Sequence, residues 1–237
     1  MFSSHGPDRS PRQNRVLAAY LALNGGFVNS AGFVVLGVFT SHVSGNVGKL
    51  SDDAARGSSA SAIAAAMLVL AFGLGGFWAS SILQSPVFQS MPLAYAFALL
   101  NESVLLTAFV RLSPWGRGFE LASGVLLGLA MGMQNSLVTQ ISHARVRTTH
   151  LTGVTTDLSI ELATWWRWSR HEAGGPHRPS PTTALLLLTI LATFIAGAFL
   201  GAWAAVKWGR EAMLAPAGAV LLASIYAFDS KRRNRQR

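Results

Sequence analysis

The stretch "TALLLLTILATFIAGAFLGAWAA", residues 183–205, contains no charged side chain and is long enough to cross a bilayer as one helix. A hydrocarbon core of roughly 30 Å needs about 20 consecutive apolar residues at the rise of an α-helix. Lipid offers no hydrogen-bond partner to backbone N–H and C=O groups, so such a segment forms its hydrogen bonds internally. The stretch therefore predicts a transmembrane helix, and it sets the fold class of the chain.

Similar apolar runs recur along the whole sequence. The six predicted spans cover residues 15–39, 60–83, 92–111, 119–141, 183–205 and 212–229. Only 12% of the 237 residues are charged, against roughly 25% in an ordinary soluble domain. None of the runs alternates between polar and apolar residues, as the strands of a membrane barrel would. We therefore predict an all-α, polytopic membrane protein with one integral membrane domain over residues 1–237.

The distribution of positive charge predicts the orientation of these spans. If the N-terminus is cytoplasmic, thirteen of the 19 Lys and Arg residues fall on the inner side, namely in the tail 1–14 with the adjoining Arg15, in the loop 142–182 and in the basic tail 230–237. Positive residues favour the inner side, so both termini are predicted to be cytoplasmic. Topology and attraction to anionic lipid account for the net charge of +9, and no nucleic-acid partner is predicted.

The sequence contains an internal repeat. The paired blocks are "GFVNS" (Gly26–Ser30) with "GMQNS" (Gly132–Ser136), "HVSGN" (His42–Asn46) with "HLTGV" (His150–Val154) and, more weakly, "GGFWA" (Gly75–Ala79) with "GAFLG" (Gly197–Gly201). The blocks occur in the same order, which indicates duplication of a three-helix unit, residues 15–111 and 118–229. Because each unit has an odd number of spans, the two would have opposite orientation, an architecture found in many secondary transporters.

The stretch "GFVNSAGFVVLGVFTSHVSGNVGKL", residues 26–50, resembles the opening signature of the YoaK-like family of bacterial integral membrane proteins, which is defined as a domain of unknown function. The similarity extends over nearly the whole chain through the six-span layout and the second His-x-Thr-Gly block. It implies a bacterial inner-membrane protein without an assigned activity. Asn29 departs from the family pattern, in which an acid is often expected, so any role of that acid in proton coupling does not carry over.

The two histidine turns are candidate binding sites. His42 and Asn46 share one face of a helix if the segment is helical, and Gly45 allows close backbone approach, so the group suits an anion or a polar solute at the membrane boundary. The alternative is a helix cap, which Ser or Asn provides without histidine. His150 and Gly153 repeat the pattern in the second unit and keep both readings open.

Three polar residues within the predicted spans are candidates for a solute or coupling site. Asn29 and Asn135 occupy matched positions in the repeat, and amides at this depth either hydrogen-bond between helices or face a solute. Glu102 lies in the middle of the third span, where an ionised carboxylate in hydrocarbon is costly. It is therefore expected to be protonated, paired across the bundle or next to a wet cavity.

The inner loop contains the segment "LTGVTTDLSIELATWWRWSR", which predicts an amphipathic helix with Trp165 and Trp166 at headgroup level. His171 and His177 follow it without a third ligand at fixed spacing, so no metal is predicted. The chain has no cysteine and no hydrolase or metalloprotease motif. We therefore expect no catalytic residues and no cofactor.

The leading prediction is a small-solute permease or exporter of the inverted-repeat type. The alternative is a membrane interaction or assembly protein that recruits a partner through residues 142–182. The partners that we expect are the lipid bilayer and a small solute, and a homo-oligomer is left open.

Overall fold

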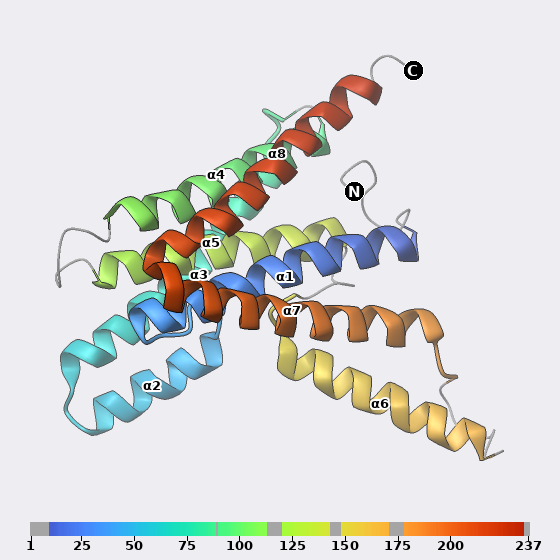
Figure 1. Ribbon diagram of the computed structural model, residues 1–237, viewed down its shortest axis with the longest axis horizontal. Coiled ribbons are helices and arrows are strands. Elements are labelled where there is room, and N and C mark those ends of the chain that lie inside the picture. Colours follow the sequence, from blue (N-terminus) through green and yellow to red (C-terminus); the bar gives the residue numbers. More distant parts are fainter. Residues whose placement is uncertain (1–9, 89, 113–119, 143–147, 171–177, 235–237) are drawn as a thin grey trace.

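The computed structural model describes residues 10–88, 90–112, 120–142, 148–170 and 178–234, with side chains up to residue 229. The elements are α1 (Pro11–Leu36), α2 (Val43–Ala55), α3 (Ser59–Gln84), α4 (Met91–Leu112), α5 (Glu120–Ser142), α6 (Leu151–Ser169), α7 (Pro181–Trp208), the 3₁₀ helix η4 (Gly209–Met213) and α8 (Leu214–Asn234). All regular structure in these residues is helical, which confirms the all-α prediction for them (Figure 1).

Five helical stretches are long and apolar enough to cross a membrane. Four are α1, α3, α4 and α5, and the fifth is the 49-residue stretch Pro181–Asp229, which contains both α7 and α8. Gly209 interrupts that stretch with a φ of 58°, a backbone conformation that favours glycine. The length and composition of these helices indicate a multi-pass membrane protein. The count of six spans stays a prediction.

Two helix pairs run parallel and approach closely at glycines. On α1 and α7, a Cβ at Gly26 would clash with the Phe194 carbonyl, and one at Gly197 with the Leu23 carbonyl. On α3 and α5, a Cβ at Gly75 would clash with the Leu129 carbonyl, and one at Gly132 with the Phe72 carbonyl. These four glycines belong to the repeated blocks of the sequence. Small residues of this kind let helix backbones pack closely within membranes.

α1 and α5 cross in the centre of the bundle and run antiparallel. A Cβ at Gly25 would lie 3.1 Å from Gln134 Nε2, and one at Gly32 would lie 3.2 Å from Leu127 Cδ1. Because the later residue on α1 meets the earlier residue on α5, the two helices point in opposite directions. α5 is the more deeply buried of the two and contributes Leu127 and other buried residues to the core.

α4 and α8 form a second antiparallel pair, beside this centre (Figure 1). Two hydroxyls hold them together: Ser103 donates to the Ala217 carbonyl at 2.9 Å, and Ser224 donates to the Ala96 carbonyl at 2.6 Å. Hydroxyl to carbonyl bonds between helices satisfy polar groups that lipid cannot satisfy.

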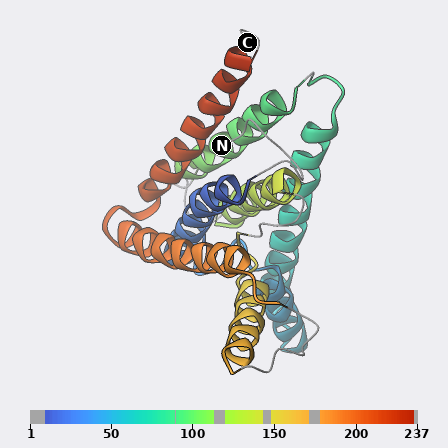
Figure 2. The same ribbon diagram turned by 90° about the vertical axis from the view of Figure 1, so that its right-hand side faces the viewer.

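α2 and α6 begin inside the bundle. The Ser41 hydroxyl donates to Asn29 Oδ1 at 2.8 Å, and the Thr149 hydroxyl donates to Asn135 Oδ1 at 2.6 Å. Asn29 and Asn135 each lie seven residues before the end of their helix, so the chain turns back by about 10 Å before the next helix starts. From there α2 and α6 run toward opposite ends of the molecule (Figure 1), on the same face of the bundle (Figure 2).

The location of the histidine turns relative to the membrane boundary stays a prediction. The end of the first span is corrected: it was predicted at residue 39, whereas α1 ends at Leu36 because Gly37 adopts a φ of 71° that reverses the chain.

Candidate functional site

A cavity of about 640 Å³ lies between α3 and α5, next to the start of α6. Its polar lining includes Ser80, Gln84, Ser136, Thr139 and Gln140 together with Asn135 and His150. Its apolar part is formed by Phe72 and by glycines of both helices. The volume lies in the range of small-molecule sites, roughly 300 to 1,000 Å³.

The lining side chains are ordered by hydrogen bonds across the α3–α5 pair. The Ser80 and Ser136 hydroxyls lie 2.8 Å apart, and Gln140 Nε2 donates to Ser80 at 3.0 Å and to Ser136 at 3.1 Å. These bonds leave the Gln140 carbonyl oxygen and the whole Gln84 amide without a protein partner in the part of the chain that the structure describes. The cavity therefore presents hydrogen-bonding groups that a solute or water can engage.

His150 occupies the N-cap position of α6, on the wall of this cavity. Its side chain is exposed and makes no capping hydrogen bond. The first backbone N–H groups of a helix have no partner within that helix, so those of α6 are not satisfied by the cap side chain. Gly153 leaves open space beside this first turn, because a Cβ there would meet no atom within 4 Å.

In the first unit, the corresponding histidine packs against aromatic rings. His42 is the N-cap residue of α2, and it too makes no capping hydrogen bond. Its ring stacks on Phe39 with centroids 4.9 Å apart, and Phe39 stacks on Phe33 at 4.2 Å. Phe33 is largely exposed on the outer surface of α1. The two histidine turns thus share a backbone position and differ in what lies beside them.

A separate polar cluster lies where α1, α4 and α5 meet. Asn24 Nδ2 donates to Gln134 Oε1 at 2.8 Å and approaches Glu102 Oε1 at 3.5 Å. Gln134 Nε2 in turn donates to the Leu21 carbonyl at 2.7 Å. All three side chains are buried, with exposed fractions of 6% or less. The cluster links the helices at the centre of the bundle.

The residues that the sequence singled out fall into different surroundings. Asn135 and His150 line the cavity, whereas Glu102 belongs to the buried cluster. Asn29 is buried and bonded to Ser41. Asn46 is buried on α2 and donates to the Phe39 carbonyl at 3.1 Å, so it secures the turn. The expected common polar centre of Asn29, Glu102 and Asn135 is therefore divided among three hydrogen-bonded groups.

The structure also locates the glycine and the tryptophans for which the sequence predicted a structural or interface role. A Cβ at Gly45 would contact only His42 Cβ, at 3.6 Å. Trp165 and Trp166 are exposed on the outer part of α6, and the Arg170 guanidinium lies 4.2 Å from the Trp166 ring centroid. His171 and His177 lie outside the described residues, as do the tail residues 1–9 and 235–237.

The sequence reasoning missed the α3–α5 lining residues. The signal was present in "GMQNSLVTQ", because Gly132, Asn135, Ser136, Thr139 and Gln140 recur at helical spacing on one face. A polar face on a membrane-length helix is unusual and points to a cavity or a helix contact.

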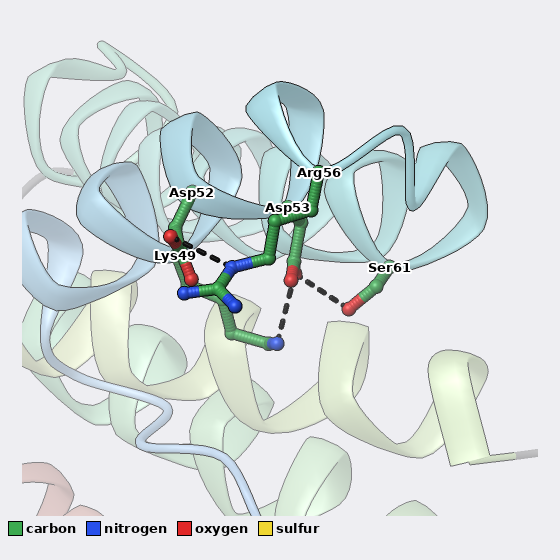
Figure 3. Close-up of polar contacts among 5 residues, drawn as sticks. All are labelled: Lys49, Asp52, Asp53, Arg56 and Ser61. Atoms are coloured by element: carbon green, nitrogen blue, oxygen red, sulfur yellow. Dashed lines mark hydrogen bonds and ion pairs between the residues drawn. The ribbon is translucent and has the colours of Figure 1, made fainter.

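Charged residues gather on α2 rather than in the cavity (Figure 3). Lys49 Nζ lies 2.8 Å from Asp53 Oδ2, and Arg56 Nε lies 3.0 Å from Asp52 Oδ1. The Ser61 hydroxyl of α3 donates to Asp53 at 2.6 Å. These hydrogen bonds, first that of Lys49, lower the pKa of Asp53 below its ordinary value of 3.8. The cluster joins the outer end of α2 to the start of α3.

Comparison with known proteins gives one match. The family model described as "Protein of unknown function (DUF1275)" matches residues 17–226, which is most of the chain. No curated protein matches the chain, and no solved structure does.

Proposed function

The chain belongs to the DUF1275 family, and from the geometry of its cavity we propose that it is a permease for a small polar solute, without enzymatic activity. The observation that carries the proposal is the polar cavity between α3 and α5. Hydrocarbon cannot satisfy the amides and hydroxyls of this lining, so in a bilayer they need water or a solute. We propose that the solute passes through this cavity.

An inverted repeat of residues 15–111 and 118–229 is part of the proposal. Helices at equivalent positions, α1 with α5 and α4 with α8, run antiparallel, as an inversion requires. The hydrogen bond from Ser41 to Asn29 has its equivalent in the bond from Thr149 to Asn135. Discontinuous helices that begin near the middle of a bundle are characteristic of the solute sites of such transporters.

We further propose that the protein lies in the bacterial inner membrane with both termini cytoplasmic. α1 begins and α8 ends at the same end of the bundle (Figure 1). Trp165, Trp166 and Trp168 are exposed near the outer end of α6, and Trp203 and Trp208 are exposed at the far end of α7. Two such groups match the aromatic belts at the two interfaces of a bilayer, and the excess of Lys and Arg in the inner segments supports the orientation.

The absence of cysteine from the sequence permits a direct test of the cavity. Ser136→Cys places a thiol on the lining, and Ser30→Cys places one at the equivalent position of α1. With the protein in liposomes, we expect a membrane-impermeant thiosulfonate to modify Ser136→Cys rapidly and Ser30→Cys slowly. The same modification should block solute flux through Ser136→Cys alone.

Two results would reject the permease. One is the absence of protein-dependent flux in a screen that includes uncharged, anionic and cationic solutes. The other is a Ser136→Cys thiol that reacts no faster than Ser30→Cys, because the α3–α5 surface would then not be aqueous.

A second candidate function is recruitment of a protein partner through α6. Val154 is the buried residue of α6, while Ile160, Leu162 and the three tryptophans are exposed. The bilayer covers such a surface equally well. Affinity purification in mild detergent separates the two: a stoichiometric partner that is lost in Ile160→Ser/Trp166→Ser, with solute flux unchanged, would favour recruitment.

A further inference from the structure

We infer that the cavity between α3 and α5 selects small anions, such as a monocarboxylate or a monovalent inorganic anion. This inference rests on the proposed permease function and specifies its solute. It combines three observations: the charge of the lining, the helix that begins at the cavity wall, and the contrast with the equivalent turn at His42.

The lining offers hydrogen-bond donors and no negative charge. Of the described residues that line the cavity, His150 is the one ionisable side chain, and none is a carboxylate. The Gln84 amide can donate to an anion, and so can one of the two hydroxyls of Ser80 and Ser136, since the other donates within that pair; the Thr139 hydroxyl already donates to the Asn135 carbonyl. A cation would need carboxylates or several free carbonyl oxygens to replace its hydration, and this lining does not contain a carboxylate. The side chains therefore favour negative over positive solutes.

The electrostatic potential at the cavity wall is positive, so it also favours an anion. α6 has 19 residues and begins at His150, so the positive end of its dipole and its unpaired first-turn N–H groups lie at the cavity. Gly153 leaves the backbone of the first turn accessible. A small anion at this point would receive donors from the backbone and from the lining.

The first unit provides an internal comparison. α2 also begins at a histidine, but the His42 ring stacks on Phe39, which in turn stacks on Phe33. The same helix position thus faces aromatic rings in one unit and a polar cavity in the other. We therefore place the anion at His150 and not at His42.

Swelling of proteoliposomes measures the selectivity. Vesicles are mixed with solutions of ammonium formate, glycerol, urea or choline gluconate, and light scattering follows the entry of solute. Ammonia crosses the lipid and becomes ammonium with a proton that enters alongside formate, so ammonium formate reports formate entry coupled to a proton, and potassium formate with valinomycin reports entry of the formate anion alone. Choline gluconate swells the vesicles only if a large cation and a large anion both enter. We expect wild-type protein to accelerate formate entry at least tenfold over protein-free vesicles and to leave the other rates unchanged. A membrane potential set with potassium and valinomycin should alter formate entry if the anion moves alone.

Paired variants locate the effect. Ser136→Leu fills the lining and should reduce protein-dependent formate entry at least tenfold, while Ser30→Leu, its equivalent on α1, should retain the wild-type rate. His150→Leu should lower formate entry and His42→Leu should not. Size-exclusion chromatography in detergent identifies any variant that fails to fold, and Ser136→Ala, which removes one donor with little volume change, then replaces Ser136→Leu.

Each outcome decides between the two proposals. Entry of glycerol or urea that Ser136→Leu blocks, without formate entry, would overturn anion selectivity and retain the permease. Entry of choline would do the same. No accelerated entry of any solute would overturn the permease itself.

Discussion

The outer surfaces of two helix pairs, α3–α5 and α1–α7, have the same backbone arrangement and opposite chemistry. The repeated blocks equate Ser80 with Ala202, Thr139 with Phe33 and Gln140 with Val34. On α3–α5 these positions form a polar cavity. On α1–α7, Phe33 and Val34 are exposed, as expected of residues in contact with lipid. One surface is therefore suited to hydrocarbon, and the other requires a polar occupant.

Helix packing in both pairs and the polar chemistry of one surface depend largely on different residues. The close approach in both pairs comes from glycines whose Cβ would clash with a facing carbonyl. The polar part of the lining comes from hydroxyl and amide side chains beside these glycines, and Gly132 itself borders the cavity. A polar lining side chain can therefore be changed without breaking the packing.

The largest effect is expected from Gly132→Ala. Its Cβ would clash with the Phe72 carbonyl, which is helix backbone and cannot rotate away, so α3 and α5 must separate. Overpacking of this kind costs about 3 kcal/mol. Unfolding by SDS in mixed micelles, followed by circular dichroism, measures the change. Gly26→Ala, at the equivalent position facing Phe194, should lose a similar amount.

Gly73→Ala is the matched control on α3. Gly73 lies two residues before Gly75, and a Cβ there would meet no atom within 4 Å. The free energy of unfolding should not fall in this variant. A loss equal to that of Gly132→Ala would show that glycine is needed for a reason other than close packing.

A smaller loss is expected from Gln134→Val, which introduces the residue type found at the equivalent position, Val28. Gln134 bonds both Asn24 and the Leu21 carbonyl, and the substitution leaves these buried groups without that partner. An unsatisfied buried group costs roughly 1 to 3 kcal/mol, so we expect a loss of about 2 kcal/mol. The same unfolding assay measures it.

Gln140→Val, two turns later on α5, separates stability from function. Gln140 lines the cavity and is only partly buried. The free energy of unfolding of Gln140→Val should therefore remain near that of the wild type, while solute flux falls. If Gln140→Val unfolds as readily as Gln134→Val, the division between a structural cluster and a solute cavity is wrong.

Asn29→Ala and Asn135→Ala should each lower the free energy of unfolding by about 1 kcal/mol, because each removes one hydrogen-bond acceptor. Asn29 accepts from both the hydroxyl and the backbone N–H of Ser41, and it is the more deeply buried residue. Its variant should therefore be the less stable of the two. Asn135→Ala should affect flux more, since Asn135 lines the cavity. A reversed order in either measurement would contradict the assignment of the two turns.

The sequence predicted the helical class and the paired blocks because apolar length and repeated motifs are local properties. The α1–α2 turn was misplaced because the apolar composition continues through Val38 and Phe39, and only the left-handed backbone at Gly37 reverses the chain. The cavity could be read in part from the polar face of α5. Its other wall, with Ser80 and Gln84, depends on which helix packs against α5, and that is a tertiary property.

The smallest effect concerns two carboxylates, one on α2 and one on α6, that connect these helices to the helices that follow them, α3 and α7. Asp53 accepts from Lys49 and from the Ser61 hydroxyl of α3, whereas its equivalent, Glu161, accepts from the Ser180 backbone N–H at the start of α7. The first pair of bonds lowers the pKa of Asp53 below 3.8, so the carboxylate is charged to lower pH in the folded protein. A depressed folded pKa contributes stability that is present above the unfolded pKa and is lost as the pH falls through the folded value.

Lys49→Gln should raise the pKa of Asp53 most, and Ser61→Ala should raise it less, as measured by carboxyl ¹³C NMR. Because Asp53 lies near the surface and is only partly buried, the accompanying change in stability should be small, and salt should reduce it further. An unchanged Asp53 pKa in both variants would mean that these contacts do not hold α2 to α3.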